Sequence, residues 1–288
     1  MLLASSLISS KLHVYWDDPV LLVLNVIAGT GKCSPYRLPV VGSGLKVRGV
    51  ITGRRLLEVL LGRRGTALRE KLGMRGVLRK SVGLFCDEAH NVFSEKTPIQ
   101  AVAQFMVENN IGSVFVVDET LTFKGVIDET AFLTKMKKRK YDIGVRDIMQ
   151  TDVYTVSPQV DIFSAAQAML DNRVRRLPVV INDEVVGILT ITDILKHILT
   201  EEKHIPAVLE DSELALDESV EEIMIRDVAK VGSETDIGAA ANQMLEEDVS
   251  SLVVVKDEKL EGIISRIDLI SGLARISGID ALTELVKR

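Results

Sequence analysis

Cysteine and aromatic residues are scarce in this sequence of 288 residues. It contains two cysteines, Cys33 and Cys86, and aromatic residues make up 4% of the chain. Two cysteines exclude the disulfide framework of a small secreted domain, and no Cys-x-x-Cys pair or Cys/His cluster has the spacing of a zinc site. We therefore expect a core of Val, Leu, Ile and Ala, and a reducing, cytoplasmic location.

Long apolar runs and targeting signals are also missing. The apolar run 19–29 is interrupted by Asn25 and falls well short of the roughly 20 residues of a membrane-spanning helix. The first residues show no basic region before an apolar core and no clear cleavage site. We therefore expect no membrane segment. A content of 47% apolar and 26% charged residues is typical of a globular protein, here long enough for two domains.

Catalytic signatures are lacking as well. The four histidines have no metal-ligand spacing, and no Ser/His/Asp signature accompanies them. We therefore predict that the protein is not an enzyme, that it has no catalytic or metal-binding residues, and that it uses no catalytic cofactor.

What the sequence does contain is a unit of about 60 residues that occurs four times. Three segments of the third copy reappear 75 positions later in the fourth: 145–149, 161–169 and 177–180 correspond to 220–224, 236–244 and 252–255. Two weaker copies precede them. Each copy reads as strand, helix, strand, strand, helix, and the first strands of copies three and four are predicted at 153–156 and 228–231. A glycine marks each copy, at positions 49, 125, 187 and 262, and the long, short, long spacing indicates that the copies work in pairs.

The third copy shows how a strand passes directly into a helix. After Thr190 the apolar residues adopt helical spacing, at Ile191, Ile194, Leu195, Ile198 and Leu199. Thr190 and Asp193 thus lie at a helix start, where free backbone N–H groups suit a phosphate and an ionised Asp can accept hydrogen bonds from two ribose hydroxyls. The same pair can instead form a capping box that needs no ligand. Both interpretations remain open on the pattern alone.

These units resemble CBS (cystathionine-β-synthase) domains, because they carry strands of the Leu-Pro-Val-Val type followed by the pattern Gly-x-x-Thr/Ser-x-x-Asp, both of which copy three has in full. The whole chain resembles two tandem CBS pairs, or Bateman modules, as in the gamma subunit of AMP-activated protein kinase and stand-alone archaeal CBS proteins. The resemblance implies an α/β fold of four β-α-β-β-α repeats in a disc-like assembly. We place the repeats at 1–68, 77–140, 141–203 and 216–288.

The resemblance also implies a function. The family binds adenosine ligands, including AMP, ADP, ATP and S-adenosylmethionine, in the cleft between paired repeats. The chain is therefore expected to be a non-enzymatic regulatory protein that senses adenine nucleotides and relays the energy state to a protein partner, such as an enzyme, kinase or transporter.

The signature is not intact in every copy. Copies three and four keep the carboxylate, as Asp193 and Asp268, whereas Arg55 and Ala131 stand at that position in copies one and two. Because neither Arg nor Ala can accept a hydrogen bond through its side chain, we expect the ligand in the pair formed by repeats 3 and 4.

By resemblance, the ligand-binding residues of that pair supply a phosphate contact, a ribose contact and an apolar wall for the adenine. They are Val153, Tyr154, Thr155, Arg175, Arg176, Pro178, Thr190, Asp193, Val228, Lys230, Val253, Ser265, Arg266 and Asp268. Arg175 and Arg176 precede the strand that faces the phosphate, and a guanidinium matches phosphate oxygens well. In copy one, Arg37 occupies the position that corresponds to Arg176. Binding of an anion in the first pair therefore remains an open alternative.

Charge is distributed unevenly along the chain. The net charge is −6, yet residues 1–80 hold 14 Lys and Arg against 4 Asp and Glu. This asymmetry supports an alternative function, in which vestigial sites belong to an interaction scaffold and the basic N-terminal half docks an acidic protein or, less favoured, a nucleic acid. A homodimer is left open as the assembly.

Overall fold

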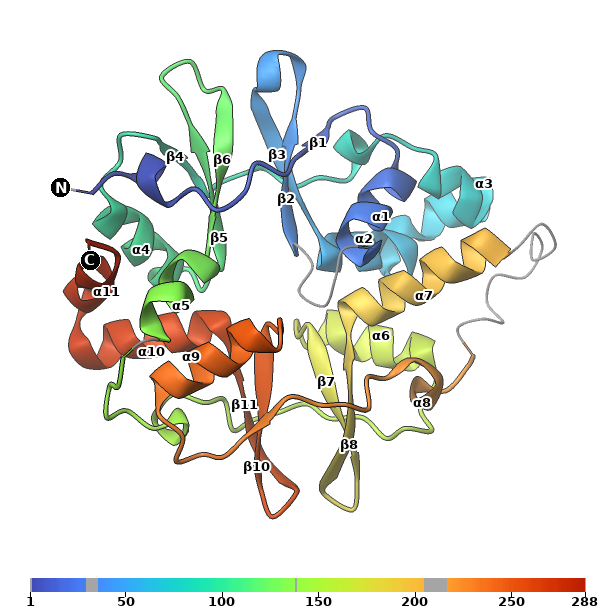
Figure 1. Cartoon of the computed structure of the whole chain (residues 1–288). Coiled ribbons are helices and arrows are strands. Elements are labelled where there is room, and N and C mark those ends of the chain that lie inside the picture. Colours follow the sequence, from blue (N-terminus) through green and yellow to red (C-terminus); the bar gives the residue numbers. More distant parts are fainter. Residues whose placement is uncertain (1, 30–35, 138, 205–216, 288) are drawn as a thin grey trace.

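The computed structural model describes residues 2–29, 36–137, 139–204 and 217–287, so Cys33 lies outside the described part of the chain. The fold is α/β and consists of four repeats arranged in a ring, with the first pair above and the second pair below in Figure 1. The fold class expected from the resemblance is therefore confirmed.

The four repeats share one order of elements. Repeat 1 contains β1 (Val14–Tyr15), α1 (Val20–Gly29), β2 (Arg37–Val41), β3 (Val47–Thr52) and α2 (Gly53–Leu60), followed by α3 (Thr66–Leu78). Repeat 2 contains β4 (Val92–Ser94), α4 (Ile99–Glu108), β5 (Ser113–Val117), β6 (Phe123–Asp128) and α5 (Thr130–Met136).

The second pair repeats this order, except that a single bridge at Val156 stands in place of the first strand of repeat 3. Repeat 3 contains α6 (Ile162–Asp171), β7 (Arg176–Ile181), β8 (Glu184–Thr190) and α7 (Ile191–His204). Repeat 4 contains α8 (Val220–Ile223), β9 (Lys230–Val231), α9 (Ile237–Glu246), β10 (Ser251–Lys256), β11 (Lys259–Ser265), α10 (Arg266–Ser277) and α11 (Ile279–Lys287). Short 3-10 turns connect them at η1 (Ala4–Leu7), η2 (Ser43–Leu45), η3 (Arg63–Gly65), η4 (Val82–Leu84) and η5 (Val145–Asp147). The exact repeat limits stay a prediction.

One predicted strand, 153–156 at the start of repeat 3, is wrong. Val156 alone bridges to Val179, through backbone bonds to Pro178 O and from Val180 N. Extending the parallel ladder to Tyr154 would need the N–H of residue 178, which proline lacks. In repeat 4 the equivalent residue is Val253, and its N–H does donate to Ala229 O at 2.9 Å.

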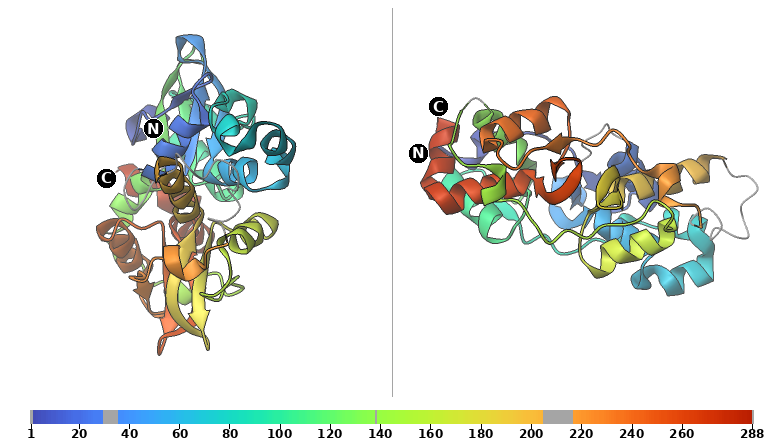
Figure 2. Two further views of the ribbon diagram at one scale, coloured as in Figure 1. Left: turned by 90° about the vertical axis from the view of Figure 1, so that its right-hand side faces the viewer. Right: turned by 90° about the horizontal axis from the view of Figure 1, so that it is seen from below.

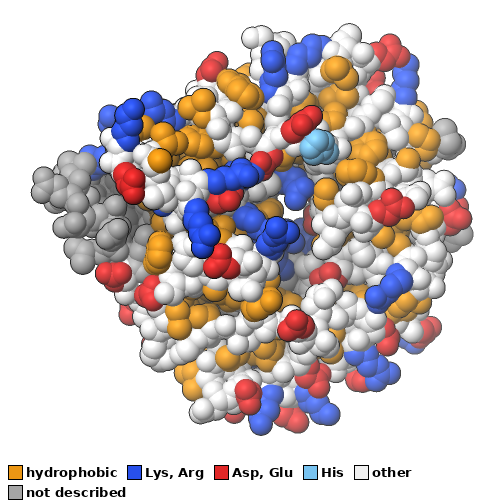
Figure 3. All heavy atoms as spheres, turned by 180° about the vertical axis from the view of Figure 1, so that it is seen from behind, with side chains coloured by type: hydrophobic (Ala, Val, Ile, Leu, Met, Phe, Trp, Pro, Cys, Tyr) orange, Lys and Arg blue, Asp and Glu red, His pale blue; other side chains and the backbone are white. Residues whose placement is uncertain are grey.

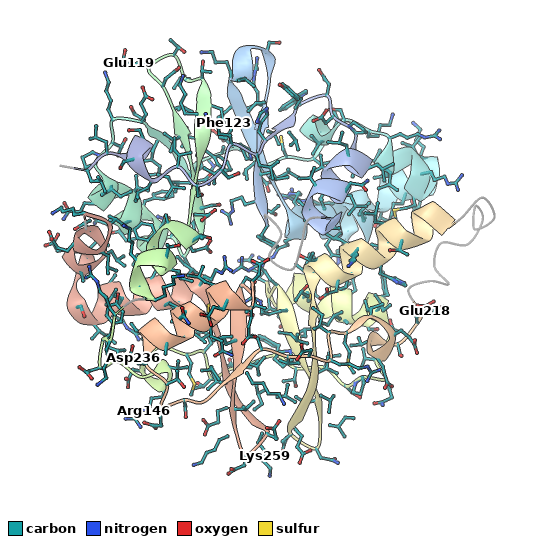
Figure 4. All side chains as sticks on the ribbon, in the orientation of Figure 1. Glu119, Phe123, Arg146, Glu218, Asp236 and Lys259 are labelled. Atoms are coloured by element: carbon teal, nitrogen blue, oxygen red, sulfur yellow. The ribbon has the colours of Figure 1, made fainter. Side chains whose placement is uncertain are left out.

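Within each pair the two repeats meet through their sheets. In the second pair β8 and β11 join by one antiparallel bridge, so the sheet order is β7-β8-β11-β10-β9. The first pair keeps two three-stranded sheets, β1-β2-β3 and β4-β5-β6, linked by the bridge between Lys46 and Thr122. A small apolar cluster that includes Val50 and Phe123 fills the space between them (Figure 4).

Between the pairs the contact is made by helices. One core joins repeats 1 and 3, where α1 and α2 pack against α7, and another joins repeats 2 and 4, where α5 packs against α9 and α11. The edge-on views of Figure 2 show that the ring is thinner than it is wide. Amphipathic helices such as α2 thus bury their apolar faces against the opposite pair as well as within their own repeat.

The marker glycines allow the chain before each repeat to cross onto the partner repeat. Bridges join Ser10 to Val126, Asp87 to Val50, Gln150 to Ile263 and Ile225 to Ile188. A Cβ atom at Gly262 would lie 2.7 Å from Gln150 O, and one at Gly49 would lie 2.7 Å from Asp87 O. Glycine is therefore required for close backbone approach at these strands.

Candidate functional site

Two strand-to-helix junctions of the second pair have the same hydrogen bonds. Thr190 N and Thr190 Oγ1 both donate to Asp193 Oδ2, at 2.8 and 2.6 Å. Ser265 N and Ser265 Oγ donate to Asp268 Oδ2 at the same two distances. Each pair thus satisfies orphan groups at the start of its helix, as in a capping box.

The cap leaves half of the Asp193 carboxylate uncommitted. Both bonds end on Oδ2, and no side chain or backbone group of the described residues donates to Oδ1. Burial raises the pKa of Asp193, while the Thr190 hydrogen bonds and the charge of Lys196 act in the opposite direction. A hydroxyl donor at Oδ1 would compensate for the lost water. Capping and ligand binding are therefore compatible roles for this residue.

Asp193 faces a cavity of about 1590 Å³ where the four repeats meet. The space-filling view of Figure 3 shows a hollow in the middle of the ring with Lys and Arg side chains around it. Of the predicted site residues, the cavity is lined by Arg175, Arg176, Thr190, Asp193, Val228, Lys230 and Arg266. The cavity thus brings together the predicted ribose contact, Asp193, with the predicted phosphate contacts, Arg175 and Arg176, and with Val228 of the predicted adenine wall.

The other predicted residues do not line this cavity. They are Val153, Tyr154, Thr155, Pro178, Val253, Ser265 and Asp268. Val253 is buried in β10 beside Lys230, and Pro178 is buried in β7, so both lie within the sheet. Tyr154 is exposed, and Asp268 belongs to the junction of repeat 4. Their role as ligand contacts stays a prediction.

The arginines at the cavity are held by neighbouring repeats. Arg176 donates to Ser250 Oγ of repeat 4 at 3.0 Å, and the guanidinium of Arg175 lies 4.8 Å above the ring of Tyr36 in repeat 1. Arg266 is only 7% exposed and donates to Val249 O, Met244 O and Thr130 Oγ1. Three of its five N–H groups are thus engaged, and Arg266 serves chiefly as a clamp between repeats 4 and 2.

The first pair also contributes charge, which the sequence-based site did not include. Arg37 and Glu129 line the cavity together with Tyr36. Burial lowers the pKa of Arg37, and the nearby charge of Arg175 lowers it further. The sequence of the repeats contained this signal, because Tyr36 and Arg37 stand at the start of β2 as Arg175 and Arg176 stand at the start of β7. Likewise, Glu129 stands at the position of Arg266.

The crossing chain contacts both junctions of the first pair. Arg55 of repeat 1 pairs with both carboxylate oxygens of Asp87, which precedes repeat 2, and also with Glu58. In repeat 2, Asp128 Oδ2 lies 2.8 Å from the Ser9 hydroxyl. The junction of repeat 1 is therefore filled from within the protein, whereas Asp128 of repeat 2 still lines the central cavity.

Comparison with known proteins identifies the repeats. The CBS domain family model matches residues 91–138, 145–200 and 220–275. The protein belongs to the CBS domain family. The match covers repeats 2, 3 and 4, and the described part of repeat 1 has the same order of elements.

Two similar proteins match this CBS protein over most of its length. An uncharacterised 33.4 kDa protein in a ribosomal RNA operon of Thermofilum pendens is 28% identical over 262 residues, which cover 90% of this chain and 87% of that protein. The crystal structure of protein MJ1225 of Methanocaldococcus jannaschii, described as a candidate archaeal homologue of γ-AMPK, superposes with a TM-score of 0.82 at 23% identity. The superposition covers 93% of this chain and 99% of MJ1225, and it shows the shared fold.

A third relative is an enzyme. Homoserine O-acetyltransferase of Methanobrevibacter ruminantium is 38% identical over 123 residues, which are 42% of this CBS protein and 22% of that enzyme. The match is confined to a minor part of the acetyltransferase. Within the described ranges, no helix has the length and apolar character needed to cross a membrane.

Proposed function

We propose that this protein is a non-enzymatic cytoplasmic regulator that binds AMP, ADP or ATP in the cleft between repeats 3 and 4. The observation that carries the proposal is the uncommitted Oδ1 of Asp193 at the edge of a cavity lined by Arg175 and Arg176. A ribose diol donates to Oδ1, and the phosphate extends from there towards the two guanidinium groups.

The base of the nucleotide has an apolar wall on the partner repeat. Ile225, Val228 and Ala229 line the same cavity from the segment that precedes β9. This segment is bridged to β8 at Ile188, so the wall and the ribose position are held by one sheet. An adenine against these side chains would bury apolar surface without needing further charge.

Regulation would follow from the way the pairs are joined. The ligand contacts repeats 3 and 4, while Arg175 reaches the ring of Tyr36 in repeat 1. A nucleotide that binds one arrangement of the repeats more tightly than another shifts the population by that affinity difference. A partner enzyme, kinase or transporter would read the altered surface of the ring.

Replacing Asp193 by alanine tests the proposal. We expect the AMP affinity to fall by about 1.5–3 kcal/mol, or roughly ten- to hundredfold, because a hydrogen bond to a charged acceptor is lost. Isothermal titration calorimetry measures the change. Asp161→Ala is the matched control, since Asp161 caps α6 through Ser164 N at 2.7 Å without lining the cavity. Unchanged AMP binding in Asp193→Ala would leave Asp193 as a helix cap and refute the proposal.

One observation favours a second candidate function, that of a docking scaffold. Exposed basic side chains gather around α3, including Arg63, Arg64, Lys71, Arg79 and Lys80. An acidic protein or a nucleic acid would bind there with an affinity that falls steeply as salt is added. Salt-dependent association that survives Asp193→Ala would assign this surface a role separate from the nucleotide site.

A further inference from the structure

Glu129 is one of the carboxylates that line the central cavity together with arginines. Glu129 follows β6 and lies against Gly112 so closely that a Cβ atom there would be 1.8 Å from Glu129 Oε1. Arg37 of repeat 1, Arg175 of repeat 3 and Arg266 of repeat 4 line the same cavity. No side chain of the described residues donates a hydrogen bond to the Glu129 carboxylate. Its ionised form is therefore favoured by its own backbone N–H and by the charges of these arginines.

Comparison of the four repeats shows that only repeat 2 has a negatively charged residue at the position of Glu129. Glu129 occupies the position of Arg266, immediately after the Asp128 and Ser265 that end the third strand of their repeats. Arg266 reaches across the ring to Thr130 Oγ1, the residue next to Glu129. The negative charge of Glu129 in repeat 2 and the positive charge of Arg266 in repeat 4 thus occupy equivalent positions and lie near each other. The first pair has this charge although Arg55 and Ala131 replace the ribose-binding carboxylates there.

We infer that Glu129 is an internal competitor for the phosphate of the ligand, so that binding of the anion is coupled to protonation of this carboxyl group. The inference rests on the proposed function, because it assigns the phosphate end of the same ligand to the central arginines. Repeat 2 would then regulate the site of repeats 3 and 4 without binding a nucleotide itself.

The physical argument is electrostatic. The charges facing Glu129 are Arg37, Arg175 and Arg266, which favour its ionised form, and Asp128, which opposes it. Burial raises the pKa of Glu129 above its ordinary value of 4.5 even with these arginines present. A phosphate that approaches the same guanidinium groups adds negative charge and takes over their attraction, so it raises this pKa further.

The direction of the pH effect follows. Below the pKa of Glu129 in the free protein the carboxyl group is neutral in both states, and the anion binds at full strength. As the pH rises through this pKa towards the higher one of the complex, affinity falls and binding takes up a proton. Above both values the affinity is constant and weak. Acidification therefore strengthens the binding of an anion at these arginines.

Glu129→Gln in the full chain tests the coupling. Sulfate is the first probe, because it does not titrate near neutral pH, and AMP is the second. At mildly alkaline pH we expect Glu129→Gln to bind both anions about tenfold more tightly than the wild type, the effect of a one-unit pKa change. The difference should vanish at acidic pH, and proton uptake, measured by calorimetry in buffers of different ionisation enthalpy, should disappear.

Two further variants sharpen the test. Gly112→Ala keeps the charge but must displace the carboxylate, so it should also strengthen sulfate binding. Glu247→Gln removes an equal charge from an exposed position at the cavity rim, where Gln243 already pairs with it, and should change nothing. Equal affinities of wild type and Glu129→Gln for both anions at every pH would overturn the inference alone. Sulfate binding that responds to Glu129→Gln without any AMP binding would instead overturn the proposed nucleotide function.

Discussion

Replacing Phe132 by alanine is expected to lower the free energy of unfolding by about 3–5 kcal/mol, the usual cost of deleting a buried aromatic side chain. Phe132 is 0% exposed and lies on α5, which packs against α9 and α11 of repeat 4. The loss should exceed that of an ordinary surface change because the cavity opens in the core shared by the two pairs. Urea unfolding followed by circular dichroism measures the difference.

Phe163→Ala is the matched control. Phe163 is 43% exposed on α6, so the same deletion from a helix should cost less than about 1 kcal/mol. If the two variants lost equal stability, the helix core between repeats 2 and 4 would not hold the pairs together. A loss confined to Phe132→Ala would show that the closed ring depends on contact between the pairs.

The sequence predicted the repeat architecture because each repeat contains local signals. The change from strand to helical spacing at Thr190, and the marker glycines such as Gly187, are patterns within one copy that recur at fixed offsets. The Thr190 and Asp193 pair was also open to two interpretations from sequence alone. The structure shows the cap, and the free Oδ1 shows why the cap does not exclude a ligand.

What the sequence did not predict depends on contacts between repeats. The strand proposed at 153–156 fails because Pro178, on another strand, cannot donate the bond that Tyr154 would need. Likewise, the site was assigned to repeats 3 and 4 from their intact carboxylates, whereas Arg37 and Glu129 reach the cavity from the opposite pair. Side chains that converge only after four repeats close a ring leave no spacing signal in any one of them.

Replacing Gly262 by valine is expected to reduce stability by about 3 kcal/mol, at the upper end of the cost of overpacking. The new Cβ would lie 2.7 Å from Gln150 O and 3.0 Å from Met149 Sδ. Gln150 and Ile263 exchange two backbone hydrogen bonds of 2.9 Å at this place, so the chain before repeat 3 must leave β11. Hydrogen exchange should show early loss of protection at these two amides.

Gly232→Val provides the control, because a Cβ at Gly232 meets no atom nearer than Thr235 Oγ1 at 3.9 Å. Its backbone angles suit other residues, so the smaller entropy of the unfolded chain should offset part of any cost. Comparable destabilisation by both substitutions would mean that glycine at 262 serves chain flexibility rather than close approach. Selective damage by Gly262→Val would instead explain why a glycine recurs at this strand in all four repeats: each repeat is anchored by the segment that leads into its partner.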